Sequence, residues 1–179
     1  MTRYVALLRG IGPGNPNMRN EKLRGVCEHL GLDNVQTVIS SGNIVFDSDR
    51  SPTEIETMLE AAWPSRLGFD ATTILRSQRE LEELAASDPF EGSEHTRETY
   101  LLTTFAKREL SYDFSFPHQP EGKDYRMVGG TERELFSVTD TVNGTSLDVM
   151  SWLEDTFGKE ISSRTWLTVS RILKRMGSR

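Results

Sequence analysis

The chain has 179 residues, of which 36% are hydrophobic and 27% charged, and its formal net charge at pH 7 is −6. This composition is typical of a globular protein, and the length suits one large domain or two small ones. The apolar runs are too short to span a membrane, and no secretory leader is evident, so we expect a cytoplasmic protein. The acidic balance argues against broad nucleic-acid binding by electrostatics alone.

The charge is unevenly placed along the chain. Residues 161–179 hold five basic and no acidic residues, so the remainder carries −11. A basic helix end complements the helix dipole, and it also suits a local anion site, so both interpretations stay open.

Cysteine and histidine usage excludes several kinds of site. Cys27 is the single cysteine, so no disulfide can form within the chain. It falls in an apolar helical stripe, which indicates a buried small hydrophobe. His29, His95 and His118 lack metal-ligand spacing, so we predict no metal site, and no motif indicates a cofactor.

The first 76 residues predict the order strand, helix, strand, strand, helix, strand. Apolar runs indicate strands at 4–8, 35–39, 44–46 and 70–75. We expect Asn17 or Asn20 to cap the first helix, and Ser51 to open the second through a capping box.

The second half predicts a degraded copy of that order without a residue-level repeat. A capping box at Ser77 opens a helix, strands follow at 99–105, 125–128 and 135–138, and residues 107–123 are poorly patterned. Two helices close the chain. We therefore predict an α/β (α+β) fold of two ferredoxin-like βαββαβ-type units, residues 1–76 and 77–179, with antiparallel sheets, helices on one face and an extra C-terminal helix.

Four phrases carry a family resemblance, namely YVALLRGI, VQTVISSGNIVF, DPF and SRTWLTVSRIL. With them, essentially the whole chain resembles the bacterial "domain of unknown function 1697" family. The resemblance implies two ferredoxin-like units in a cytoplasmic protein of unassigned activity. The chain departs from the family pattern in five residues, which are Gly12, Thr145, Ser146, Thr165 and Leu167.

The stretch LLRGIGPGNPNMR, residues 7–19, is the first candidate site. An arginine at a strand end, followed by glycines and a helix start, is typical of a loop that holds a phosphate or carboxylate. The alternative is a rigid connection in which Arg9 forms an internal salt bridge. No nucleotide-binding fingerprint is met. The tentative ligand-binding residues are Arg9, Gly10, Gly12, Gly14, Asn15, Ser41, Asn43 and Arg164, which we expect to converge in a cleft between the units.

Three functions remain open from the sequence. The first is a protein that binds a small anionic ligand, the second is a structural or protein-interaction module, and the third is a weak RNA-binding module, which would need exposed rings on its sheet. No catalytic set stands out, so the sequence does not decide whether the protein is an enzyme. We expect a monomer or homodimer without membrane contact.

Overall fold

The structure is a computed structural model that describes residues 1–141 and 146–178. The chain divides into two compact units. Unit 1 comprises Met1–Glu82 with Arg171–Arg179, and unit 2 comprises Glu83–Ser170. In the described part of the chain, no helix combines the length and apolar character needed to cross a membrane.

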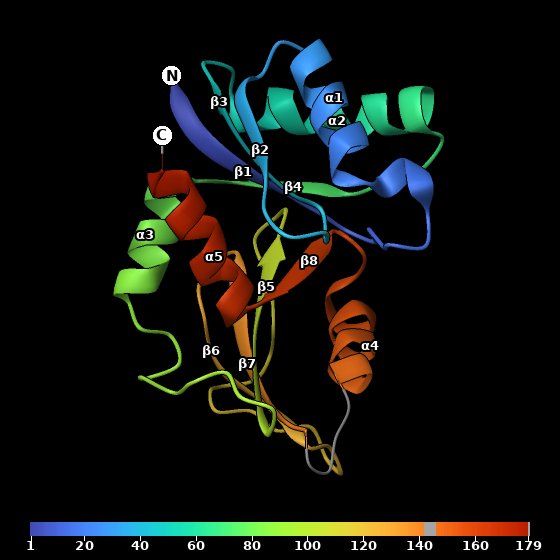
Figure 1. The fold of residues 1–179 in the computed structure, drawn as a ribbon. Coiled ribbons are helices and arrows are strands. Elements are labelled where there is room, and N and C mark those ends of the chain that lie inside the picture. Colours follow the sequence, from blue (N-terminus) through green and yellow to red (C-terminus); the bar gives the residue numbers. More distant parts are fainter. Residues whose placement is uncertain (142–145, 179) are drawn as a thin grey trace. The chain divides into compact units, whose positions relative to one another are not determined.

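Unit 1 is built on a four-stranded antiparallel sheet with the order β2-β3-β1-β4. Helices α1 and α2 lie together on one face of this sheet (Figure 1). The order of elements predicted for residues 1–76 is confirmed. The bounds are β1 (Thr2–Leu8), α1 (Asn20–His29), β2 (Asp33–Thr37), β3 (Asn43–Ser48), α2 (Pro52–Leu67) and β4 (Thr73–Ser77).

The core of unit 1 lies between its sheet and helices. Tyr4, Ala6 and Leu8 of β1 pack there with Leu23 of α1 and Trp63 of α2. Because side chains alternate along a strand, the remaining β1 residues point to the opposite face, and those from Arg3 onward are buried as well. The strand is therefore buried on both faces, as its almost continuous apolar sequence predicts.

The helix starts of unit 1 confirm one expectation and correct another. Ser51 forms the predicted capping box with Glu54 at the start of α2. The predicted cap of α1 is wrong, because Arg19 occupies that position and makes no side-chain cap hydrogen bond. The Asn20 amide instead donates to the carbonyl oxygen of Ile39 at 2.9 Å, so it holds a neighbouring turn rather than the helix start.

Unit 2 has a second four-stranded antiparallel sheet, with the order β6-β7-β5-β8. The described residues thus confirm the mixed α/β class with two antiparallel sheets. Strand β8 was not predicted, because its polar sequence lacks an apolar run. The remaining elements are α3 (Gln78–Ala86), β5 (Thr99–Ala106), β6 (Tyr125–Gly130), β7 (Glu134–Asp140), α4 (Ser146–Phe157), β8 (Ile161–Thr165) and α5 (Trp166–Gly177).

Residues 107–124 replace the first crossover helix in unit 2. The segment has no regular secondary structure, but its burial alternates. Tyr112, Phe114, Phe116 and His118 are half-buried, whereas the residues between them are exposed. Phe114 and Phe116 pack against the core formed by the sheet and α4. Aromatic side chains therefore cover the sheet where unit 1 uses a helix.

One outer strand of each sheet shifts its pairing register against its neighbour. Strand β2 shifts register against β3 between Asp33 and Gln36. Strand β6 shifts register against β7 between Met127 and Gly129. Strands β2 and β6 occupy equivalent edge positions in the two strand orders, so the two sheets are irregular at the same position.

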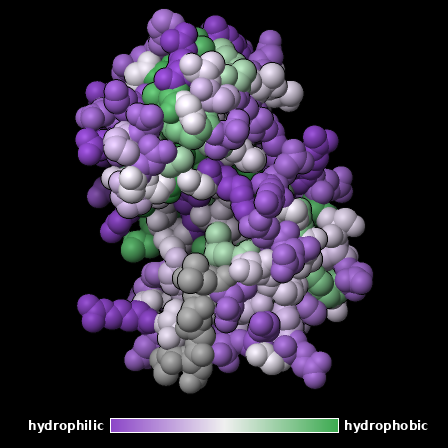
Figure 2. All heavy atoms as spheres, turned by 90° about the vertical axis from the view of Figure 1, so that its right-hand side faces the viewer, coloured by the Kyte–Doolittle hydropathy of each residue, from purple (hydrophilic) through white to green (hydrophobic). Residues whose placement is uncertain are grey.

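Hydrophilic residues dominate the face shown in Figure 2, and hydrophobic residues form small separate patches there. Among the described residues, the large hydrophobic side chains that are exposed are Met1, Ile39, Met150 and Leu167. Such single exposed residues are normal on protein surfaces and do not by themselves mark an interface.

The capping box of α2 predicts a pH-dependent stability difference. Hydrogen bonds from the hydroxyl and backbone N–H of Ser51 hold the pKa of the Glu54 carboxyl below its usual range. Its stabilisation is therefore present at neutral pH and is lost as the pH falls through the lowered pKa. We expect Glu54→Gln to lower the unfolding temperature at pH 7, and the difference from wild type to shrink in acid.

The control for this comparison is Glu94→Gln, at an exposed loop position. The measurement is thermal unfolding by circular dichroism from pH 7 to pH 3. A difference between wild type and Glu54→Gln that stays constant across this range would contradict the role of the carboxylate.

Candidate functional site

Seven of the eight predicted site residues lie in unit 1, in the loop after β1, in the turn before β3 and at the first residue of β3. The two segments adjoin, because the N–H of Leu8 donates to the carbonyl oxygen of Gly42 at 2.9 Å. Gly42 also lies directly against Ile11 of the loop. The seven residues are Arg9, Gly10, Gly12, Gly14, Asn15, Ser41 and Asn43.

Several polar side chains of this region hold the turns themselves. The side-chain oxygen of Asn15 accepts from the backbone N–H of Asn17 at 2.9 Å. The amide of Asn43 donates to the Val38 carbonyl oxygen at 3.0 Å and to Ser41 Oγ at 2.9 Å. Asn43 is only 1% exposed. These contacts support the structural interpretation of Asn15, Ser41 and Asn43 rather than direct ligand contact.

The fold does not require glycine at two positions of the loop. At Gly12 and Gly14, an added Cβ would meet nothing within 4 Å, and neither backbone has a positive φ. Neither packing nor backbone conformation therefore demands glycine at these positions. A glycine also lets an external group approach the backbone closely, which is the reason for glycine at many phosphate-binding loops.

Arg9 and the start of α1 give the loop its charge. Arg9 follows β1 and is half-buried, and its backbone N–H donates to the Thr72 carbonyl oxygen at 2.9 Å. The exposed Arg19 and Lys22 flank the start of α1, where Glu21 is the acidic residue of the first turn. Partial positive charge at a helix start adds to these cations. Basic residues therefore outnumber the acidic Glu21 around the start of α1.

Backbone strain lies beside this loop. Ile39 has a φ of +49° and is 39% exposed. A β-branched residue rarely adopts this left-handed conformation, which costs about 1–2 kcal/mol. The hydrogen bond from Asn20 to its carbonyl oxygen helps to hold it there.

The eighth predicted residue, Arg164, lies in β8 of unit 2. Its side chain is almost fully buried, and Nη1 donates at 2.8 Å both to Ser162 Oγ and to the Ser163 carbonyl oxygen. Burial lowers the pKa of Arg164 to about 10. The convergence of Arg164 with the loop of unit 1 stays a prediction.

Arg76 is the counterpart of Arg164 in unit 1, and the sequence analysis missed it. Both arginines stand one residue before the end of the fourth strand of their unit, and a helix follows directly. In each case Nη1 donates to the carbonyl oxygen of the preceding residue at 2.8 Å. Arginine followed by a small hydroxyl residue, Ser77 or Thr165, is the signal that could have revealed this repeat.

Cys27 has no role in this site. It is fully buried in the core under α1. Burial raises the pKa of its thiol to about 12. The predicted role of Cys27 as a buried hydrophobe is confirmed. Burial also disfavours the thiolate, which is the reactive form of cysteine.

These observations define the class of the molecule, a mixed α/β protein with two antiparallel sheets of equivalent strand order. The chain belongs to the family described as "Protein of unknown function (DUF1697)", whose sequence model matches residues 1–136. The closing phrase SRTWLTVSRIL lies beyond the matched residues. The departure from the family pattern at Thr145 lies outside the residues that the structure describes.

One solved structure extends the fold similarity to nearly the whole chain. The conserved bacterial protein SP0830 from Streptococcus pneumoniae is 23% identical, and the match covers 98% of each chain with a TM-score of 0.72. At this identity the similarity shows the fold alone. No curated protein matches the chain.

The contact between the loop and the turn predicts a sharp requirement for Gly42. Its φ is +76°, and an added Cβ would lie 2.7 Å from Ile11 Cγ1 and 3.0 Å from Leu8 Cβ. We expect Gly42→Ala to destabilise the fold by about 1–2 kcal/mol through the backbone alone, with the contact against Ile11 adding to this. Denaturant unfolding measures the change.

The matched control is Gly25→Ala in α1, where an added Cβ meets nothing within 4 Å. Alanine is the better helix former, so this variant should gain about 0.5–1 kcal/mol. If Gly42→Ala were as stable as wild type, the loop and the turn would not be in the contact described.

Proposed function

We propose that the protein binds a small phosphorylated or carboxylated ligand at the loop Arg9–Asn15. The observation that carries this proposal is the pair of glycines, Gly12 and Gly14, for which the fold offers no requirement. A ligand that approaches the backbone would explain the glycines, because any side chain at these positions would occupy the space in which the ligand lies.

In this proposal, both a side chain and backbone N–H groups of the loop bind the anion. Arg9 offers a guanidinium group, which binds phosphate or carboxylate through paired, charge-assisted hydrogen bonds. Backbone N–H groups of the loop add neutral donors. Pro13 provides none, and the N–H of Asn15 already donates to the Gly12 carbonyl oxygen at 3.4 Å. Few backbone donors remain, so Arg9 contributes most of the affinity.

The structural alternative is favoured by a different observation. Asn15 and Asn43 use their side chains to hold turns, and Asn20 ties the start of α1 to the turn before β3. A loop built only to connect β1 to α1 would need these contacts and no ligand. In that case Arg9 would contribute to stability alone.

The RNA-binding alternative draws no support from the aromatic residues of unit 1. Base stacking on a sheet needs exposed rings on its open face. Tyr4 and Phe46 are the rings that the sequence offers, and both are buried in the core on the side of the helices. They cannot reach a base in this fold.

Ligand binding predicts a thermal shift that depends on Arg9. The probes are inorganic phosphate, adenosine 5′-monophosphate, glucose 6-phosphate and succinate, each titrated against the purified protein. A probe at about 100 times its Kd adds about 2.7 kcal/mol, which raises the unfolding temperature by about 5–10 °C for a chain of this length. Arg9→Ala should lose this shift.

A second variant separates binding from stability, because Arg9 also has contacts within the fold. Gly14→Ala adds a methyl group where the protein has open space, so it should fold normally and bind more weakly. Arg24→Ala, at an exposed position on α1, controls for loss of charge and should keep the full shift. No shift with any probe, together with a lower unfolding temperature for Arg9→Ala, would favour the structural alternative.

A further inference from the structure

Strand β4 stands at an edge of the sheet in unit 1 and pairs with β1 in continuous register. In an antiparallel pair, every second residue of an edge strand turns its N–H and carbonyl groups away from the neighbouring strand. In β4 these residues are Thr73, Leu75 and Ser77, because their N–H groups donate to side chains rather than to β1. Such an outer row of backbone groups is the part of a sheet that can recruit a strand from another molecule.

Two carboxylates of α2 occupy the first two donors of this row. The N–H of Thr73 donates to Glu60 Oε1 at 2.9 Å, and the N–H of Leu75 donates to Glu56 Oε1 at 3.0 Å. Both glutamates are half-buried. Hydrogen bonds to a carboxylate are stronger than bonds between neutral groups. The two carboxylates thus hold the positions that carbonyl oxygens of an added strand would take.

The spacings of the helix and the strand make this match possible. Residues four apart lie on one side of a helix, about 6 Å apart along its axis, and residues two apart on a strand are separated by about 6.6 Å. Glu60 meets Thr73 and Glu56 meets Leu75, so the order is reversed between the two elements. The indole N–H of Trp63 fixes this alignment, because it donates to Thr73 Oγ1 at 2.9 Å.

Side chains occupy further groups of the same edge. The N–H of Ser77 donates to Glu80 Oε2 at 2.7 Å. The carbonyl oxygen of Leu75 accepts from Arg76 Nη1 at 2.8 Å, so both outward groups of Leu75 are bonded to side chains. The capping box of α3 by itself explains the position of Glu80. Helix capping does not explain the two glutamates of α2, which lie within that helix.

An identical strand is the partner that fits this row of groups. The outward groups at residues 73, 75 and 77 are arranged symmetrically about residue 75. A second β4 in antiparallel orientation would therefore pair residue 73 with residue 77, and Leu75 with Leu75, about a twofold axis. Every outward N–H would then meet a carbonyl oxygen of the second copy. This pairing requires the side chain of Glu56 to leave Leu75.

We propose that Glu56 and Glu60 prevent β4 from pairing with the β4 of a second copy of this chain, and that Arg76 blocks the carbonyl oxygen at the centre of the same edge. The contacts are autoinhibitory, because they occupy the groups through which the two copies would associate. Packing of α2 on the sheet does not require the carboxylates, since the residues of α2 in the core are apolar. Partial burial of two carboxylates also costs free energy of desolvation.

The test is sedimentation velocity of Glu56→Ala/Glu60→Ala and of wild type over rising protein concentration. We expect wild type to keep its mass, and the variant to convert to a species of twice that mass. The matched control is Glu56→Gln/Glu60→Gln, which loses the same charges but retains side-chain oxygens that accept from the N–H groups, so it should behave as wild type. An alanine variant that keeps the wild-type mass would overturn the proposal. Equal association of the glutamine variant would overturn it in favour of simple charge repulsion.

Hydrogen exchange measured by mass spectrometry locates the association. In the alanine variant, the amide hydrogens of residues 73–77 should exchange faster than in wild type at low concentration, because their acceptors are lost. At high concentration they should exchange more slowly, because the second β4 protects them. Association that leaves exchange in β4 independent of concentration would overturn the proposal. If the double variant fails to fold, Glu56→Ala replaces it, because this single change opens the central donor at Leu75.

Discussion

The burial of β1 on both faces is the constraint on which unit 1 depends. A strand that is covered on both sides cannot carry a charge that lacks a partner, so its interior is apolar from Tyr4 to Leu8. Arg9 is the first position after the strand at which a cation is half-exposed. The polar loop and the turn before β3 meet there because β3 pairs with β1. The candidate anion site is thus placed by the register of the central strand.

Unit 2 has the same strand order as unit 1, but different elements pack on its sheet. Strand β5 takes the central place of β1, and α4 takes the place of α2. The first crossover helix has no counterpart, and the alternating aromatic residues of 107–124 pack on the sheet instead. A helix covers a sheet with an unbroken backbone, whereas an extended segment covers it with separate side chains. The cluster of aromatic side chains in this segment follows from this difference.

The fold was largely predictable from the sequence because local signals and tertiary structure agree over most of it. The capping boxes at Ser51 and Ser77 mark real helix starts, and apolar runs mark most strands. Strand β8 escaped prediction because its pairing with β5, rather than hydrophobicity, determines its conformation. The prediction of the α1 cap was wrong because the Asn20 amide donates to the turn before β3.

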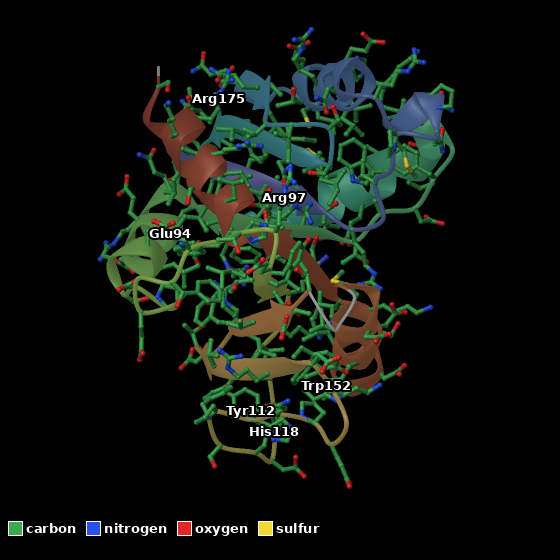
Figure 3. The ribbon with its side chains drawn as sticks, turned by 60° about the horizontal axis from the view of Figure 1, so that its bottom comes forward. Glu94, Arg97, Tyr112, His118, Trp152 and Arg175 are labelled. Atoms are coloured by element: carbon green, nitrogen blue, oxygen red, sulfur yellow. The ribbon has the colours of Figure 1, made fainter. Side chains whose placement is uncertain are left out.

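The site was less predictable, for physical reasons that differ between residues. A glycine-rich loop after a strand is visible in the sequence, but the internal hydrogen bonds of Asn15 and Asn43 are not. The repeat of Arg76 and Arg164 is hidden because it consists of two residues in each unit. The aromatic cluster of unit 2 was missed because Tyr112, Phe114, Phe116 and His118 alternate without forming a strand. It was also missed because Trp152 contacts them from α4 (Figure 3), which is distant in the sequence.

The register shifts in β2 and β6 affect the tendency of the protein to aggregate at high concentration. Each shift falls in an edge strand, where unpaired backbone groups could otherwise recruit a strand from another molecule. A register shift breaks the regular spacing of these backbone groups, so a strand from another molecule cannot pair along the full length of the edge. The irregularity therefore opposes edge-to-edge pairing at β2 and β6, whereas the other two edge strands, β4 and β8, pair with their neighbours without such a shift.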